Sequence, residues 1–187
     1  GEQGLSRKGA GAGNASYYYS VTRLASDGEI RIGESDFDVT GTSWLDREWS
    51  TSALSEGQAG WDWFALQLDD GRDLMLYRMR RDDGSTDPAS AGTLVDTEGG
   101  VESLGADDIV FRALETWISP ATGVSYPLHW ELRLPGHDLD LVVTPVFEAQ
   151  EMDVAVRYWE GAITVQGEQA GRPISGRGYM ELAGYAD

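Results

Sequence analysis

The stretch Trp61-Asp62-Trp63-Phe64-Ala65-Leu66-Gln67-Leu68, the turn Asp69-Asp70-Gly71-Arg72 and the segment Leu74 to Arg81 together decide the fold. Both apolar segments are rich in residues that strands favour, and Asp-Gly tolerates the left-handed backbone of a tight hairpin. We therefore predict two antiparallel strands here. Similar short segments recur along the chain between turn signals such as Asp27-Gly28 and Asp83-Gly84, and no long amphipathic helix competes.

Many short strands at regular spacing predict an all-β fold, either an antiparallel barrel or a sandwich. A closed barrel of about eight to ten strands can enclose one small ligand. The length of 187 residues suits one domain. Residues 1–14 are glycine-rich and lack apolar periodicity, so we expect an extended arm or linker there and the β-domain over residues 15–187.

Composition narrows the classes of partner. The chain has 32 acidic and 14 basic residues, a net charge of -18, which repels phosphate backbones and argues against nucleic acid. The bland explanation of this acidity is solubility or adaptation to salt. No apolar run approaches the roughly 20 residues of a membrane span. The absence of cysteine excludes disulfides and thiolate chemistry.

Tryptophans and carboxylates alternate in two of the predicted strands. Because side chains of a strand alternate between faces, one face of the earlier segment collects Trp44, Asp46 and Glu48. One face of the later segment collects Trp61, Trp63 and Gln67. If such a face lines a cavity, it can raise the pKa of a carboxyl group and offer aromatic rings to an apolar or cationic group. If such a face points outward or into an ordinary core, its aromatic rings only pack and its carboxylates form a salt bridge to Arg47.

Metal and cofactor chemistry finds little support. His129 and His137 are the only histidines, and neither has ligand-like spacing to carboxylates or a link to a nucleophile motif. We expect no metal and no cofactor. The remaining chemical groups are carboxylates among apolar residues, and each has an architectural alternative as one half of an ion pair. We expect such structural pairs to involve Arg47, Glu48, Glu160, Arg177 and Glu181.

Several spaced motifs carry a resemblance to a known family. They are Ser43-Trp44-Leu45-Asp46-Arg47-Glu48-Trp49, Gly60-Trp61-Asp62-Trp63-Phe64, Tyr158-Trp159-Glu160-Gly161 and Gly176-Arg177-Gly178-Tyr179-Met180-Glu181-Leu182. With them the chain resembles the C-terminal lipocalin-like domain of the AttH and carotenoid 1,2-hydratase group, nearly end to end. The resemblance implies an antiparallel lipocalin-like β-barrel with a calyx, closed or flattened. It also implies one half of a two-barrel protein, so a site shared between the barrels would be incomplete.

We expect the barrel to bind an isoprenoid or other lipid-like molecule, with acid-catalysed alkene hydration or cyclisation as the accompanying chemistry. Such chemistry needs a neutral acid and a surface that tolerates positive charge. The candidate acids are Asp46 and Asp62, and the candidate ligand-binding residues are Trp44, Trp61, Trp63, Gln67, Tyr77, Arg78 and Trp159. Arg78 would anchor a polar head.

Two alternatives stay open. One is a non-catalytic lipid carrier, and the other is a structural half that docks onto a second lipocalin-like barrel or another copy of itself. An open calyx with an unpaired acid would favour the enzyme, whereas an interior filled by tryptophans would favour the structural role. For the compartment, we favour the bacterial periplasm, secretion or the envelope over the cytoplasm.

Overall fold

The computed structural model describes residues 4–9, 11, 13–50, 54–154 and 156–186. A three-stranded sheet consists of β1 (Leu5–Arg7), β2 (Ala15–Ile32) and β3 (Ser35–Ser50). The second sheet has ten strands: β4 (Gln58–Leu68), β5 (Asp73–Arg81), β6 (Ala91–Val95), β7 (Val101–Gly105), β8 (Val110–Ile118), β9 (Ser125–Leu134), β10 (Leu139–Pro145), β11 (Glu151–Asp153), β12 (Arg157–Gln169) and β13 (Arg172–Ala183). The short 3₁₀ helices η2 (Ala106–Asp108) and η3 (Pro135–His137) lie between β7 and β8 and between β9 and β10.

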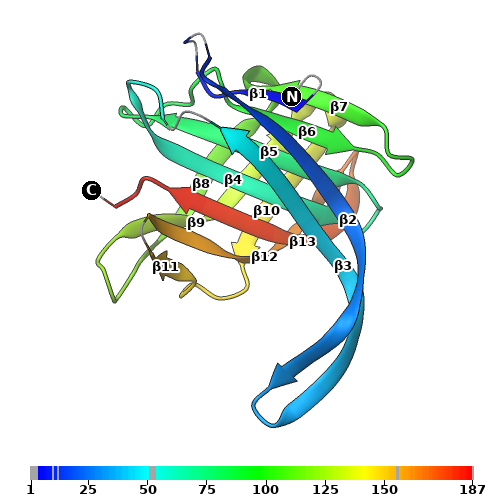
Figure 1. Cartoon of the computed structure of the whole chain (residues 1–187). Coiled ribbons are helices and arrows are strands. Elements are labelled where there is room, and N and C mark those ends of the chain that lie inside the picture. The colour runs from blue at the N-terminus through cyan, green and yellow to red at the C-terminus, as the bar shows by residue number, and fades with distance from the viewer. Residues whose placement is uncertain (1–3, 10, 12, 51–53, 155, 187) are drawn as a thin grey trace.

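The larger sheet curls into a half-barrel (Figure 1). Its strand order is β7-β6-β5-β4-β13-β12-β10-β9-β8, with β11 added beside β12, and the ladders that define this order are antiparallel. The predicted all-β class and antiparallel barrel-like architecture are thereby confirmed. The predicted hairpin is confirmed as well, since Trp63 pairs with Tyr77 and Leu66 with Leu74 across β4 and β5.

The inner face of the curled sheet holds the main core. Along β4, the side chains of Phe64, Leu66 and Leu68 are buried there, as strand alternation requires. Trp130 of β9 and Trp159 of β12 are fully buried in the same cluster. The rings of Trp130 and Phe64 meet edge to face, with 5.5 Å between their centroids. Large side chains therefore pack the interior where the sequence predicted a ligand calyx.

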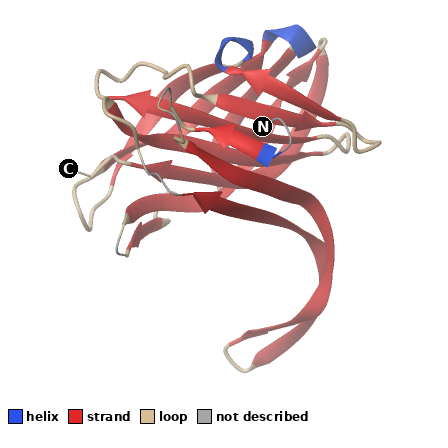
Figure 2. Ribbon diagram, turned by 45° about the horizontal axis from the view of Figure 1, so that its top comes forward, coloured by secondary structure: helices blue, strands red, loops and turns tan. Residues whose placement is uncertain are grey.

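A long hairpin of β2 and β3 crosses the outer face of the larger sheet (Figure 1). Its distal end projects beyond the body of the protein, which Figure 2 shows from a second direction. The strands continue through Asp27-Gly28, where the sequence suggested a turn, because Gly28 stays paired with Val39. The turn comes instead at Gly33, whose φ of 62° lies in the left-handed region. Leu5–Arg7, in the expected arm, forms β1 and pairs with β2.

Between the hairpin and the sheet lies a second apolar cluster. Met75, Tyr77 and Met79 of β5 form its buried part, and the half-buried side chains packed against them include Tyr18 and Trp44 of the hairpin. Trp61 and Trp63 complete it from β4. The hairpin is tied down beside this cluster by Arg23, whose guanidinium lies 2.9 Å from the buried carboxylate of Asp73.

Candidate functional site beneath the β2–β3 hairpin

The outer faces of three neighbouring strands carry aligned aromatic and acidic side chains. Glu181 of β13 is paired with Trp63 of β4, and Trp63 with Tyr77 of β5. Trp61 and Met79 form the adjacent row on β4 and β5. Directly opposed residues on antiparallel strands project from the same face of a sheet. The five side chains therefore make one surface, which is the floor of the candidate site.

The hairpin supplies the roof. Tyr18 of β2 is paired with Glu48 of β3, and Ser20 with Asp46, so these side chains share the hairpin face that looks toward the sheet. A pocket of about 320 Å³ lies between roof and floor, large enough for a small ligand. We call it the hairpin pocket. Its lining consists of Lys8, Tyr18, Asp46, Glu48, Ser50, Leu54, Trp61, Trp63, Tyr77, Met79 and Glu181.

Glu181 is the acid that the floor of this pocket presents. Its Oε1 accepts a hydrogen bond from the indole N–H of Trp61. Burial raises the pKa of Glu181, and the neighbouring negative charges, that of Glu160 first, add to this effect, although the Trp61 hydrogen bond opposes it. No cationic side chain of the described residues lies within ion-pair distance of Glu181, so the ion pair predicted for it is wrong. The carboxyl group thus keeps its proton to a higher pH than an exposed glutamate.

Asp46 occupies the roof, held by polar neighbours. Its Oδ1 accepts hydrogen bonds from the hydroxyl of Ser20 and from the indole nitrogen of Trp44, the latter at 2.8 Å. Burial raises the pKa of Tyr18, and the charge of Asp46 and a hydrogen bond to it raise it further. Trp44 therefore positions Asp46 and does not line the pocket, where the sequence predicted a direct ligand contact.

Lys8 places an ammonium group inside the hairpin pocket. Its Nζ lies 2.9 Å from Oε1 of Glu48, so the partner in the predicted Glu48 ion pair comes from the N-terminal arm. The same Nζ lies 5.1 Å from the ring centroid of Tyr77 and 5.7 Å from that of Tyr18. Sequence reasoning assigned no role to Lys8, because neither spacing nor motif links the arm to β3 or β5.

Asp62 lies on the opposite face of the sheet from the hairpin pocket. It is fully buried, with Oδ1 2.9 Å from Nη1 of Arg80 and Oδ2 3.2 Å from Nη1 of Arg78. The Tyr185 hydroxyl donates a third bond, 2.7 Å long. Burial raises the pKa of Asp62, and these three partners oppose the rise. The sequence predicted Asp62 as a catalytic acid of the ligand site. The structure corrects this, since Asp62 is the centre of a buried ion-pair network.

Three predicted ligand contacts lie elsewhere. Arg78 is engaged with Asp62 and with the carbonyl of Gly84, on the inner side of the sheet. Trp159 belongs to the main core, where its indole nitrogen donates to the carbonyl of Glu148 at 2.7 Å. Gln67 shares the face of Trp61 and Trp63 as predicted, but its amide donates to the carbonyl of Thr22 and ties the hairpin to the sheet.

Three predicted ion-pair residues have other surroundings. The guanidinium of Arg47 lies 5.3 Å from the ring centroid of Trp49, on the outward face of the hairpin. The carboxylate of Glu160 accepts a bond from the hydroxyl of Tyr179 at 3.3 Å. Arg177 is exposed. None of the three is within ion-pair distance of an opposite charge among the described residues, so these pairings are wrong.

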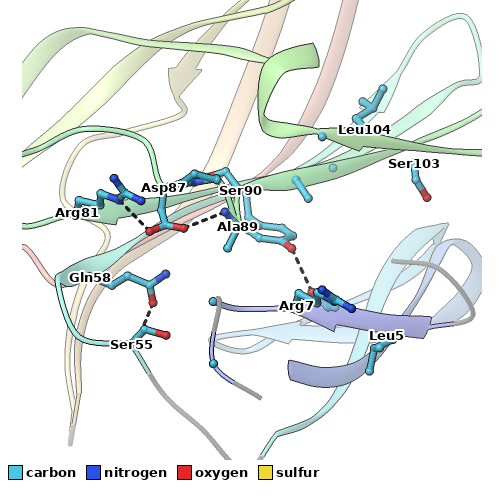
Figure 3. Close-up of a pocket in the computed structure, with 18 of the residues that line it drawn as sticks. Leu5, Arg7, Ser55, Gln58, Arg81, Asp87, Ala89, Ser90, Ser103 and Leu104 are labelled. Atoms are coloured by element: carbon cyan, nitrogen blue, oxygen red, sulfur yellow. Dashed lines mark hydrogen bonds and ion pairs between the residues drawn. The ribbon is translucent and has the colours of Figure 1, made fainter. Parts of the chain in front are cut away.

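A larger groove of about 1420 Å³ adjoins the hairpin pocket through Tyr77, which lines both. It lies between β1 and the outer face of β5, β6 and β7 (Figure 3). Two acidic residues, Glu56 and Asp87, line it, and the carboxylate of Asp87 is 2.9 Å from the guanidinium of Arg81. Burial would raise the pKa of Asp87, but the Ala89 backbone N–H and Arg81 outweigh it and lower the pKa. The lowered pKa suits Asp87 less to proton donation than Glu181, whose pKa is raised.

Over the described ranges, no cluster of three or more His, Asp or Glu side chains is placed to hold a metal ion. In the same part of the chain, no helix has the length and apolar character to traverse a membrane.

Comparison with known proteins places this geometry in context. The family model described as AttH-like matches residues 1–185. Among curated proteins, the chain is 23% identical over 145 residues to kievitone hydratase of Fusarium solani subsp. phaseoli, covering 75% of this chain and 40% of that protein. It is 24% identical over 182 residues to the dehydratase asqC of Emericella nidulans, covering 88% of this chain and 49% of that protein. The chain thus spans at most about half the length of these relatives.

Solved structures give the same picture. A crystal structure assigned to AttH from Nitrosomonas europaea matches with a TM-score of 0.89 and 41% identity, over 100% of this chain and 57% of that one. The crystal structure of kievitone hydratase from Nectria haematococca matches with a TM-score of 0.77 and 19% identity, over 98% of this chain and 56% of that one. The second likeness concerns the fold alone.

Proposed function

Because the chain belongs to the AttH-like family, we propose that it binds a lipophilic small molecule in the hairpin pocket and catalyses hydration of a carbon–carbon double bond or the reverse dehydration. The curated relatives include one hydratase and one dehydratase. The observation that carries the proposal is Glu181, a carboxyl group of raised pKa held against the indole rings of a pocket.

Glu181 is the proton donor in this proposal. Its O–H bond breaks as the proton forms a C–H bond with one carbon of the alkene, and positive charge develops on the other carbon. The rings of Trp61, Trp63 and Tyr77 line the same pocket, and aromatic faces stabilise positive charge electrostatically. Such stabilisation acts where the charge develops, which is the requirement for lowering a reaction barrier.

Asp46 is the proposed proton acceptor on the roof. A water oxygen bonds to the positively charged carbon, and the proton that the water loses passes to the Asp46 carboxylate. Exchange with solvent then returns Glu181 and Asp46 to their starting states, so the cycle needs no cofactor. Ser20 and Trp44 hold the carboxylate of Asp46 in place by hydrogen bonds. Dehydration runs through the same steps in the opposite order.

General acid catalysis of this kind contributes about 10²- to 10⁴-fold to a rate. The remaining acceleration has to come from orientation of the ligand between the hairpin and the sheet. We therefore expect productive ligands to be flat or elongated apolar molecules, because Trp61, Trp63 and Met79 give the floor an extended apolar surface. Isoprenoids and aromatic polyketide-like alkenes meet this description.

Binding is tested first, by titrating the chain with polyenes, prenylated phenols and fatty acids while following tryptophan emission. Trp61 and Trp63 line the pocket, so an occupant changes their emission. Turnover is then tested on every ligand that binds, in water enriched in heavy oxygen, with mass spectrometry of the products. Incorporation of the heavy oxygen into an alcohol product identifies hydration.

Glu181→Gln keeps the shape of the side chain and removes the acid. We expect it to retain ligand binding and to lose turnover by about 10²-fold or more. Glu168→Gln is the matched control, because Glu168 is an exposed glutamate of β12 that lies outside the pocket lining and is not among the charges that raise the pKa of Glu181. Full turnover by Glu181→Gln would overturn the role of Glu181. Tight binding without turnover of any ligand would leave a carrier as the function.

A second candidate role, docking onto another β-unit, is favoured by the outward face of the hairpin. That face continues along both strands, because residues paired across the ladder project together. It exposes Tyr17, Tyr19, Val21, Leu24, Ile30, Ile32, Phe37, Leu45 and Trp49. Trp49 is 53% exposed and Ile32 67%, whereas a strand with this alternation normally buries its apolar face.

The proposed occupant of this face is a second β-sheet unit, the partner barrel that the resemblance to the two-barrel proteins implies. The matched structure from Nitrosomonas europaea is 41% identical, and 43% of that chain lies outside the match, as 100 minus 57. A second copy of this chain fits less well, because each copy carries a net charge of -18 and the two would repel.

A chimera tests the docking role. This chain replaces its matching part in the Nitrosomonas europaea protein, and hydrogen exchange of β2 and β3 is compared between the chimera and the chain alone. We expect slower exchange in the chimera. The double change Ile30→Ser with Phe37→Ser should abolish that protection, whereas Glu29→Ser with Asp38→Ser, the adjacent pair on the other face, should retain it. Equal exchange in both proteins would refute the docking role.

A further inference from the structure

The ammonium group of Lys8 is the only cationic group lining the hairpin pocket among the described residues. It comes from the N-terminal arm and reaches in beside Glu48, with Nζ within 6 Å of two tyrosine ring centroids: 5.1 Å for Tyr77 and 5.7 Å for Tyr18. A cation at this distance from an aromatic ring is attracted by the negative face of the ring. The pocket thus already holds an ammonium group between a carboxylate and aromatic rings, which is the environment that organic cations bind in proteins.

The rest of the lining has the same electrostatic character. Asp46, Glu48 and Glu181 contribute carboxyl groups, and four aromatic side chains surround them. An anionic ligand would meet these carboxyl groups with only Lys8 to balance them, and Lys8 is engaged with Glu48. A cationic ligand would instead replace Lys8 and leave the net charge of the pocket unchanged. The net charge of -18 on the whole chain also attracts cations toward it.

We propose that the hairpin pocket contains a binding subsite for an organic ammonium group, and that Lys8 is an internal occupant of this subsite which a ligand displaces. The ligand class is a small molecule with a quaternary or tertiary ammonium centre, of a size that a pocket of about 320 Å³ accommodates. The subsite lies in the pocket of the proposed function but requires no chemical step. Its existence and the hydration chemistry can therefore fail separately.

Displacing Lys8 from Glu48 costs little free energy. The side chains of Lys8 and Glu48 are 20% and 36% exposed, so the ion pair is only partly shielded from water. Pairs with this exposure contribute little to stability. A ligand whose methylated ammonium group is less strongly hydrated than Lys8 gives up less hydration on entering the aromatic lining. Loss of Lys8 from the pocket therefore leaves the protein folded and the subsite free.

Choline and its uncharged isostere 3,3-dimethylbutan-1-ol are the test probes, because they share a shape and differ in charge. Binding is measured by calorimetry and by tryptophan emission at low ionic strength. We expect choline to bind at least about tenfold more tightly than the isostere. We also expect this preference to shrink in high salt, which screens charge. Equal affinity for the two probes would overturn the proposal.

Variants separate the subsite from general attraction to an acidic protein. Lys8→Met empties the subsite, and we expect about tenfold tighter choline binding with the isostere unchanged. Arg7→Met removes the same charge one residue earlier in the arm, outside the pocket lining, and should have little effect. Equal gains from the two variants would show that only net charge matters, which would also refute the proposal.

A second pair of variants tests the contribution of the ring itself. Tyr77→Phe and Tyr77→Leu both lose the hydrogen bond between the Tyr77 hydroxyl and Ser6, which measures 3.2 Å. Only Tyr77→Leu loses the aromatic face. We expect choline affinity to survive in Tyr77→Phe and to fall about five- to tenfold in Tyr77→Leu. If choline does not bind but alkene hydration proceeds, the subsite is rejected and the proposed function stands. If choline binds but no alkene is hydrated, the subsite stands and the proposed function is rejected.

Discussion

Asp62→Asn tests whether Asp62 is structural, as its surroundings indicate, or catalytic, as its sequence context suggested. The substitution preserves the shape of the side chain and removes its charge. In the folded protein it leaves the guanidinium groups of Arg78 and Arg80 without their carboxylate. Arg80 retains the carbonyl oxygens of Ala183 and Gly184 and the ring of Tyr185 as partners, but none of these carries a negative charge.

The expected loss of stability follows from the burial of this network. Asp62 is 0% exposed, and the side chains of Arg78 and Arg80 are 14% and 10% exposed. Removing one partner of a buried ion pair costs about 3 to 5 kcal/mol, because the remaining charge stays desolvated. At about 2 to 4 °C per kcal/mol for a domain of this size, the melting temperature should fall by about 6 to 20 °C.

The assay is urea unfolding followed by circular dichroism, with ligand binding measured below the transition. Asp140→Asn is the matched control, because Asp140 pairs with Arg133 and both side chains are exposed, so the change should cost less than about 1 kcal/mol. Ligand binding should survive in folded Asp62→Asn. A stability loss below about 1 kcal/mol would refute the reasoning. A loss of turnover without any loss of stability would restore the catalytic role.

Three further outcomes are expected. Folding raises the pKa of Glu181 above the ordinary value of a glutamate, chiefly through burial. Its contribution to stability is therefore fully present below that ordinary value and is lost as pH rises through the raised pKa, so Glu181→Gln should flatten the fall in melting temperature over this range. Arg23→Met leaves the buried carboxylate of Asp73 unpaired, and we expect proteolysis within β2 and β3 to accelerate several-fold relative to Arg31→Met, whose pair with Asp36 is exposed. Trp63→Ala should weaken ligand binding by about 2 to 3 kcal/mol, measured by calorimetry, because an indole contributes a large apolar area. Unchanged affinity in Trp63→Ala would place the ligand elsewhere.

The sequence predicts the partition of side chains well but not the side of the sheet on which each face lies. Trp61 and Trp63 share one face of β4, and Phe64 and Leu66 share the other, as alternation requires. Both faces are apolar, so hydrophobicity alone cannot say which one the core takes. The interior holds Phe64 and Leu66, and the tryptophans lie under the hairpin. A pocket predicted for the inside of a barrel is therefore found on its outside.

The acids show a second limit of single-sequence reasoning. The partners of Asp62 are Arg78 and Arg80 on the next strand and Tyr185 near the C-terminus. Register places Arg78 opposite Asp62, and the clear hairpin signal made that contact predictable. Glu181 gave a usable signal as well, because it alternates with the buried residues Met180 and Leu182. Its proximity to the hairpin and to Lys8 depends on long-range packing that no local pattern encodes.

The two proposed roles of the hairpin are physically linked, because they use opposite faces of the same two strands. Asp46 and Glu48 look toward the pocket, whereas Leu45 and Trp49 look outward. A β-unit packed on the outward face would hold β3 in place and so restrict motion of the pocket roof. Ordering the roof in advance lowers the entropic cost of ligand binding. We therefore expect the chimera with the Nitrosomonas europaea segment to bind choline more tightly than the chain alone, and that gain should disappear with Ile30→Ser and Phe37→Ser. An unchanged affinity, with the hairpin nonetheless protected from hydrogen exchange, would mean that docking and binding are independent.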